Sequence, residues 1–264
     1  MRRRFLSHIG VYAVFILMGS SMSSTETSSK NETNIPVIIE LFTSQGCSSC
    51  PPADNLLQTL TRNQPVNGAF IIPLSEHVDY WNRLGWKDPF SSKQFSDRQR
   101  KYAEVLGTEN IYTPMMIVDG VHAFVGSRST TAREVIVSAL KQPKAKLMLH
   151  TEMSGPDTVL SVRGKATELP ASNSLPEAWL AITEHLIQTE VTHGENAFRT
   201  LSHTGVVRKI QKISFASTSE TGTYEIKGQI HLNSDWLQKP MRMVVFLQVP
   251  VNGRILGATQ YSLK

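Results

Sequence analysis

The chain has 264 residues, of which 40% are hydrophobic, a composition typical of a globular protein with one large domain or two modest ones. Its formal net charge of +5 falls to +2 when Arg2, Arg3 and Arg4 are left out, and the remaining basic residues are scattered along the chain. This nearly neutral balance gives no electrostatic case for a nucleic-acid partner.

The N-terminal residues have the pattern of an export signal. Three arginines precede an apolar run over 5–19, and small polar residues follow at 20–24. The run is shorter than the roughly 20 residues of a membrane span, so an uncleaved anchor is only the alternative. We predict a signal peptide at 1–24 and a flexible leader at 25–34, and hence a periplasmic or secreted protein with no membrane association after cleavage.

Strands and helices alternate in the first part of the mature chain. An apolar run at 37–42 is typical of a strand buried on both faces. Leucines at helical spacing follow Pro51 and Pro52, which are tolerated in the first turn of a helix. The further elements expected up to residue 143 are a strand at 69–74, a loop rich in aromatic residues, a helix at 91–106, strands at 115–118 and 121–125 joined by a turn, and a helix at 131–140.

After Pro143 the pattern changes to strands in succession. Five segments, several with alternating polarity and with Gly or Pro between them, are typical of a β-sandwich. They lie at 147–153, 158–165, 179–188, 223–232 and 241–250.

The two cysteines of the chain are Cys47 and Cys50, three positions apart. Such a pair closes a very small loop and contributes little constraint on the unfolded chain, so it indicates chemistry more than structural cross-linking. It lies between a buried strand and the start of a helix, whose N-terminus stabilises a thiolate. We expect Cys47 to be the exposed nucleophile and Cys50 the buried resolving cysteine of a redox-active dithiol.

This arrangement predicts an α/β fold class: a thioredoxin-like domain over 35–143, followed by a β-rich, sandwich-like domain over 145–264. In the thioredoxin fold a cis proline faces the Cys-X-X-Cys motif, and Thr113-Pro114 stands where that proline belongs. We therefore predict a cis Pro114, with Thr113 and Pro114 presenting backbone to a bound partner. Glu40, an acid within the first strand, either is buried and accepts the proton of Cys50, as in thioredoxins, or points to solvent.

His77, Asp79 and Trp81 are further candidates for the site, and they have three interpretations. They tune Cys47 or shape a substrate groove together with Trp86. Alternatively, His77 joins the two cysteines as a ligand of Cu(I), which thiolate and imidazole suit. The third interpretation is a loop in which His77 and Asp79 bond to each other. The polar segment at 194–203 either folds against the cysteine site or caps the sandwich.

Long stretches of the chain resemble a secreted bacterial family catalogued as domain of unknown function 1223. The most specific stretch runs from Glu40 through the two cysteines to Asp54, and the resemblance covers about residues 36–264. The other matching stretches are 77–81, 85–90, 98–99, 112–114, 125–128, 194–196 and 206–208. The resemblance implies a thioredoxin-like fold and export, and it implies no reaction.

The sequence thus predicts an exported thiol–disulfide oxidoreductase that uses Cys47 and Cys50, with protein or small-molecule thiols and disulfides as partners. No organic cofactor is expected, because the chain has no phosphate-binding glycine loop and no dinucleotide fingerprint. The alternative is a Cu(I)-binding or protein-interaction module whose Cys-X-X-Cys pair is not catalytic.

Overall fold

A computed structural model describes residues 34–108, 110–154 and 158–263. The predicted signal peptide, and the leader up to residue 33, lie outside the described residues. Thr33–Lys264 form one compact unit. Within the described ranges, no helix has the length and apolarity needed to cross a membrane.

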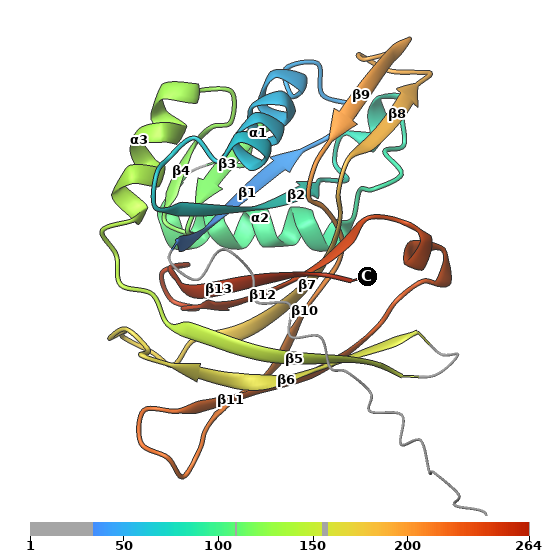
Figure 1. Cartoon of the computed structure of the whole chain (residues 1–264). Helices are drawn as coiled ribbons and strands as arrows, with labels where there is room; N and C mark the ends of the chain where they lie inside the picture. The colour runs from blue at the N-terminus through green and yellow to red at the C-terminus, as the bar shows by residue number, and fades with distance from the viewer. Residues whose placement is uncertain (1–33, 109, 155–157, 264) are drawn as a thin grey trace, which may run out of the picture. The chain divides into compact units, whose positions relative to one another are not determined.

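The first half of the unit alternates strands and helices, in the order that the sequence predicts (Figure 1). Its central strand β1 is parallel to β2 and antiparallel to β3, which in turn pairs with β4. The elements are β1 (Ile35–Thr43), α1 (Pro51–Asn63), β2 (Ala69–His77), a short 3₁₀ helix (Asn82–Leu84), α2 (Lys93–Leu106), β3 (Met115–Val118), β4 (His122–Val125) and α3 (Ser129–Ala139).

Helices cover both faces of these strands. Side chains of a strand point alternately to its two faces, so Ile39 and Leu41 pack with α1 and α3, while Ile38 packs with α2. All three side chains are fully buried. The near-continuous apolar sequence of β1 is therefore explained by a strand that is covered on both sides.

The second half consists of strands, of which β9, β10 and β13 were not predicted from the sequence. β9 pairs with β8 in a separate two-stranded ribbon, while β10, with 12 residues, is the longest strand of the described residues. The elements are β5 (Lys146–Ser154), β6 (Val159–Thr167), β7 (Glu177–Glu184), β8 (Ile187–Val191), β9 (Arg199–His203), β10 (Val206–Ser217), β11 (Tyr224–His231), a 3₁₀ helix (Ser234–Gln238), β12 (Met241–Gln248) and β13 (Ile255–Ser262).

The predicted fold class, a thioredoxin-like α/β domain followed by a sandwich, is wrong. Strands of both halves belong to one mixed sheet of 11 strands in the described chain, with the central order β13-β12-β7-β10-β2-β1-β3-β4. The two halves are joined where Val206 of β10 pairs with Ser75 of β2, and where the Ser75 amide donates to the Gly205 carbonyl at 2.8 Å. The division into domains at 35–143 and 145–264 concerns independent folding and stays a prediction.

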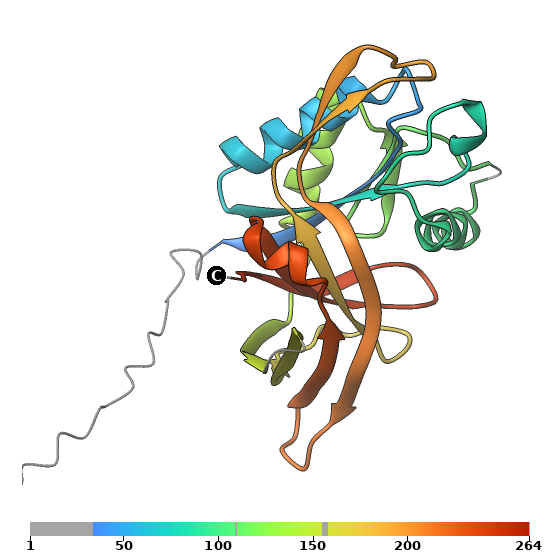
Figure 2. The same cartoon turned by 90° about the vertical axis from the view of Figure 1, so that its right-hand side faces the viewer.

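Two layers of strands enclose the core of the second half, as the turned view in Figure 2 shows. β5, β6 and β11 pack over β7, β12 and β13 through fully buried side chains such as Val162, Leu180 and Val245. The other face of β7 and β12 turns toward α2, where Phe246 packs with Ile38 and Phe95. The sheet therefore has helices against one part of it, while its own strands β11, β6 and β5 pack over the other part.

Candidate functional site: a disulfide held by a buried polar network

Cys47 and Cys50 form a disulfide in the loop between β1 and α1, with their Cα atoms 5.4 Å apart. Cys50 is the N-cap residue of α1, and Ser48 and Ser49 between the cysteines are exposed. The expectation that Cys47 is exposed is wrong, because both cysteines are fully buried. A reaction partner therefore reaches the sulfur atoms only when the residues that cover them move.

The helix N-terminus offers fewer hydrogen-bond donors to the sulfur atoms than its position suggests. Pro51 and Pro52 occupy its first two positions and carry no N–H. The next amide, of Ala53, donates to the Cys50 carbonyl. The Ser49 hydroxyl lies 3.4 Å from the Cys47 sulfur. A Cys47 thiolate would therefore be stabilised by Ser49 and the helix dipole rather than by several amide donors.

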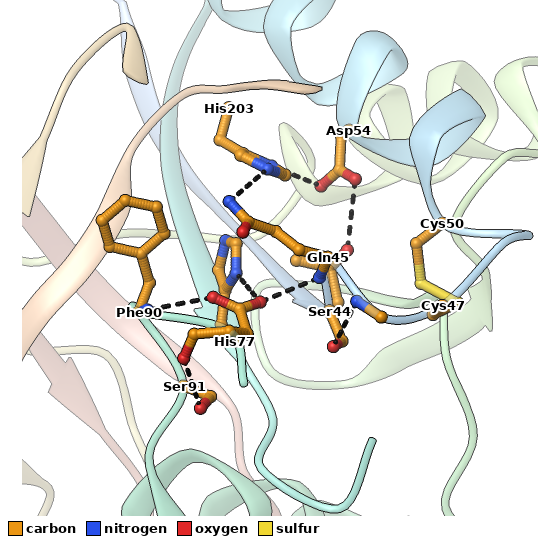
Figure 3. A network of polar contacts seen from close by, with 12 residues as sticks. Ser44, Gln45, Cys47, Cys50, Asp54, His77, Phe90, Ser91 and His203 are labelled. Atoms are coloured by element: carbon orange, nitrogen blue, oxygen red, sulfur yellow. Dashed lines mark hydrogen bonds and ion pairs between the residues drawn. A yellow bond between two sulfur atoms is a disulfide. The ribbon is translucent and has the colours of Figure 1, made fainter. Parts of the chain in front are cut away.

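A buried pair of His77 and Asp88 lies beside this loop, and dashed lines mark its contacts in Figure 3. The Asp88 carboxylate accepts a hydrogen bond from His77 Nδ1 at 2.7 Å and one from the Gln45 amide at 2.8 Å. Burial by itself would raise the pKa of Asp88, but His77 and the backbone donors of Gln45 and Phe90 outweigh it and hold that pKa below its usual value. Asp88 is therefore an ionised carboxylate in the protein interior.

A second buried pair, Asp54 and His203, lies closer to Cys50. Asp54 follows Cys50 by four residues in α1, so the two side chains lie on the same face of the helix, one turn apart. Asp54 Oδ2 accepts from the Thr43 hydroxyl at 3.2 Å, and Oδ1 lies 3.4 Å from His203 Nδ1. Burial alone would lower the pKa of His203, but the carboxylates of Asp54 and Asp88 outweigh it and raise that pKa.

Gln45 connects the two pairs and orients His203. Its side-chain oxygen accepts from the Trp86 indole at 3.1 Å, which leaves its NH₂ group facing His203 Nε2 at 3.3 Å. A donor opposite Nε2 favours a neutral ring protonated on Nδ1, facing Asp54. The carboxylates of Asp54 and Asp88 thus favour a protonated His203, whereas the Gln45 amide favours the neutral ring. Because these influences oppose each other, the protonation of His203 is sensitive to small changes nearby.

The segment at 194–203 folds against the cysteine loop, which was one of its two predicted positions. Asn196 Nδ2 donates to the carbonyls of Gln45 at 3.0 Å and of Cys47 at 2.8 Å, while Asn196 Oδ1 accepts from Arg199 at 2.8 Å. The Glu195 carboxylate accepts from the Ser48 amide at 3.0 Å. Residues about 150 positions away along the chain thus cover the disulfide loop.

Thr113, Pro114 and Trp81 lie together beside the same loop. The Thr113–Pro114 peptide bond is cis, as predicted. The Trp81 indole donates to the Thr113 hydroxyl at 2.7 Å, and a Cβ added at Gly46 would lie 3.4 Å from Trp81 Cβ. Trp81 therefore connects the Thr113–Pro114 segment to the residue that precedes Cys47.

Glu40 and Asp79, by contrast, are not brought to the disulfide. Glu40 is fully buried, so the solvent-facing alternative is wrong, but its carboxylate binds Arg98 of α2 at 2.7 Å. α2 lies on the face of the sheet opposite to α1. Asp79 accepts from the Ser96 hydroxyl of the same helix at 2.5 Å, so it does not bond to His77.

The structure therefore adds residues to the site that sequence reasoning did not select. Only Asp54 had a local signal, namely its spacing of four from Cys50 at a helix start. The added residues are Gln45, Asp54 and Asp88. Glu195, Asn196 and His203 belong to the polar segment that the sequence placed either against the site or on the sandwich. In the described part of the chain, no three His, Cys, Asp or Glu side chains are arranged to hold a metal ion.

The fold and the site together define a mixed-sheet protein with a buried Cys-X-X-Cys disulfide at the start of a helix. The chain belongs to the family described as "Protein of unknown function (DUF1223)", whose model matches residues 38–248. A comparison with curated proteins finds no match.

The solved structures that are similar to this one include the following two. Protein AGR_C_4864 from Agrobacterium tumefaciens is 26% identical, with a TM-score of 0.62 over 86% of this chain and 94% of that chain. HBP35 of Porphyromonas gingivalis is 14% identical, with a TM-score of 0.63 over 87% of this chain and 76% of that chain. The second likeness concerns the fold alone.

Proposed function

We propose that the protein catalyses thiol–disulfide exchange through Cys47 and Cys50, with protein or small-molecule thiols and disulfides as partners. One observation carries this proposal: hydrogen bonds hold the loop around the disulfide independently of the S–S bond. Asp88 binds the Gln45 amide, and Asn196 binds the carbonyls of Gln45 and Cys47. A bridge between residues three positions apart adds little further constraint, so a structural role explains it poorly.

The exchange proceeds by two substitutions at sulfur. A partner thiolate attacks Cys47 Sγ, the S–S bond breaks, and Cys50 leaves as a thiolate at the N-terminus of α1, where the helix dipole favours it. A second partner thiolate then attacks the partner's own sulfur in the mixed disulfide and releases Cys47 as a thiolate. The partner dithiol loses two electrons and becomes a disulfide, and the two cysteines gain these electrons. The opposite direction uses the same steps in reverse.

The predicted location is consistent with this chemistry. An N-terminal signal would deliver the protein to an oxidising compartment, where disulfides form and persist. There the pair would be oxidised unless a reductant acts on it, so its reduction potential decides the direction of exchange.

The test combines a potential with an activity. The mature protein is equilibrated with glutathione buffers, and its turnover of a disulfide substrate such as insulin is compared in wild type, Cys47→Ser and Cys50→Ser. We expect a potential within the range of about −120 to −270 mV that thiol–disulfide enzymes cover, and turnover that Cys47→Ser abolishes. A potential below about −300 mV, typical of structural disulfides, or activity that survives Cys47→Ser would contradict the proposal.

A further inference from the structure

A cavity of about 420 Å³ lies between α2, the strands β7 and β10, and the β12–β13 connection. This volume is within the range of about 300–1,000 Å³ of small-molecule sites. Arg98 and Tyr102 line it from α2, Trp179 from β7, Ile210 from β10, and Val249 and Pro250 from the end of β12 and the turn after it.

The cavity is separate from the disulfide. Arg98 and Tyr102 bind Glu40, and Glu40 points to the α2 face of β1. The disulfide precedes α1, which packs on the opposite face through Leu41. A molecule in the cavity would therefore not touch Cys47 or Cys50.

The hydrogen bonds around Arg98 and Tyr102, which line the cavity from α2, leave some N–H donors of Arg98 without partners. Arg98, whose side chain is 9% exposed, donates from Nε to Glu40 at 2.7 Å, from Nη1 to Gln248 at 3.1 Å and from Nη2 to Tyr102 at 3.3 Å. A guanidinium has five N–H groups. Within the described residues, one N–H on each terminal nitrogen of Arg98 therefore has no acceptor. The hydroxyl hydrogen of Tyr102 is already used on Glu40.

The Gln248 amide hydrogens are also used. They bind the Tyr102 hydroxyl at 2.6 Å and the Gly253 carbonyl at 2.9 Å. The donors that remain free are thus the N–H groups of the planar, charged Arg98 guanidinium, so a ligand that complements them must supply acceptor atoms. A carboxylate matches a guanidinium in geometry and charge.

The acidic residues that contact Arg98 do not oppose the binding of an anion. Arg98 Nε lies 2.7 Å from Glu40 Oε2 and 3.3 Å from Glu76 Oε1. Burial, more than any other influence, raises the pKa of Glu76 well above its usual value, which favours its neutral form beside Arg98. At the rim, Asp97 is paired with Lys93 and Arg100.

The other residues that line the cavity include charged side chains and the aromatic ring of Trp179, which suit an aromatic ligand. Glu177 is paired with Lys212 at 2.6 Å, and Lys101 also lines the cavity. The Trp179 ring lies parallel to that of Phe246, with 6.4 Å between centroids. Arg98 Cζ lies 5.0 Å and Lys212 Nζ 5.4 Å from the centroid of the Trp179 ring. A planar ring of a ligand beside Trp179 would therefore contact aromatic and cationic groups, both of which favour an aromatic ring.

From these contacts we infer that the cavity binds a small aromatic carboxylic acid, with its ring beside Trp179 and its carboxylate on the free N–H groups of Arg98. The claim is independent of the proposed thiol–disulfide exchange, since it concerns different residues and a different face of the sheet.

The test compares two probes with the same ring on the full mature protein. 2-Naphthoate supplies acceptors, whereas 2-naphthylmethylammonium supplies only donors. Binding is followed on the indole N–H signal of Trp179 in NMR spectra, assigned with Trp179→Phe. We expect a saturable shift with 2-naphthoate and binding about tenfold or more weaker for the ammonium, which would leave Arg98 without an acceptor. No saturable shift, or equal binding of the two probes, would overturn the inference.

A matched pair of variants locates the site. Val105→Trp adds a large side chain at a valine that lines the cavity, and Val137→Trp adds it at an exposed valine of α3 outside the cavity. Circular dichroism checks that both fold. We expect 2-naphthoate to bind about tenfold or more weakly to the first variant and as in wild type to the second. Unchanged binding to a folded Val105→Trp would overturn the placement, and the probe comparison in wild type does not depend on either variant.

Discussion

Asn196 provides the sharpest test of how the buried disulfide becomes accessible. The residue is fully buried, and its side chain joins the segment at 194–203 to the carbonyls of Gln45 and Cys47. Asn196→Ala removes both donors and leaves two carbonyls without these partners. The Cys47 carbonyl still accepts from the Cys50 amide, so the Gln45 carbonyl is the group left unsatisfied. Such a buried group costs about 1–3 kcal/mol, so the cover should become easier to open by about 1–3 kcal/mol.

This change in free energy converts to a rate. If a reductant reaches Cys47 only when the cover opens, the population of the open form controls the reaction. Since about 1.4 kcal/mol corresponds to tenfold in an equilibrium constant, 1–3 kcal/mol raises that population by about 5- to 150-fold. We expect the rate of disulfide reduction by dithiothreitol in Asn196→Ala to rise by at least about fivefold, the gain ending where the chemical step becomes limiting.

The assay needs a control that separates local opening from general destabilisation. Leu180→Ala removes a fully buried side chain from the core between the two strand layers, away from the disulfide. It should lower the free energy of unfolding by about 2–5 kcal/mol, measured by urea titration. Reduction should accelerate in Asn196→Ala and stay near the wild-type rate in Leu180→Ala. Equal rates in wild type and Asn196→Ala, despite the expected loss of stability, would refute the view that this segment controls access.

Three further predictions concern ionisable groups, two of them beside the disulfide loop and one in the cluster around Arg98. Glu195→Gln removes a carboxylate that binds the Ser48 amide beside Cys47, so the Cys47 thiolate should form more readily and reduced protein should react about two- to threefold faster with iodoacetamide at pH 7; a slower reaction would contradict this. Because the folded protein raises the pKa of His203, its pairing with Asp54 stabilises the fold fully below about pH 6.5 and loses this contribution as pH rises through the raised value. Asp54→Asn should therefore lower the free energy of unfolding more at pH 6 than at pH 8.5, and an equal loss at both would contradict the pairing. Burial raises the pKa of Glu76, so above about pH 4.3 this group is ionised in the unfolded chain but not in the folded one, and the fold loses stability as pH rises. In urea titrations between pH 4 and 7, Glu76→Gln should therefore become more stable relative to wild type as pH rises. A stability difference that stays constant with pH would show that Glu76 is ionised in the fold.

The candidate site was predictable from sequence where its signals are local. A buried strand before Cys47, two prolines after Cys50 and the apolar strand after Pro114 all depend on residues close together in the chain. The period of the apolar residues, the restricted backbone of proline and the spacing between residues indicate such local relations directly. The same local logic misplaced Glu40, because an apolar run does not reveal which face of a strand lies against which helix.

The prediction of the fold class was wrong because one strand that joins the two halves was missed. Val206–Ser217 was not predicted as β10, and without it the first half of the chain looked like a domain of its own. The structure shows β10 beside both β2 and β7, so it unites the two halves in one sheet. Pairing between strands is a relation between distant segments, which the pattern within either segment does not contain.

The chain by itself thus determined the position of the Cys-X-X-Cys pair between a strand and a helix and the family to which the protein belongs, because both depend on short stretches of sequence. Only the tertiary structure decided what surrounds the disulfide. Asn196 and His203 reach Gln45 from 151 and 158 residues away, and Asp88 rather than Asp79 binds His77. Closing such distances is an outcome of packing the whole chain, and the burial of Cys47 follows from it.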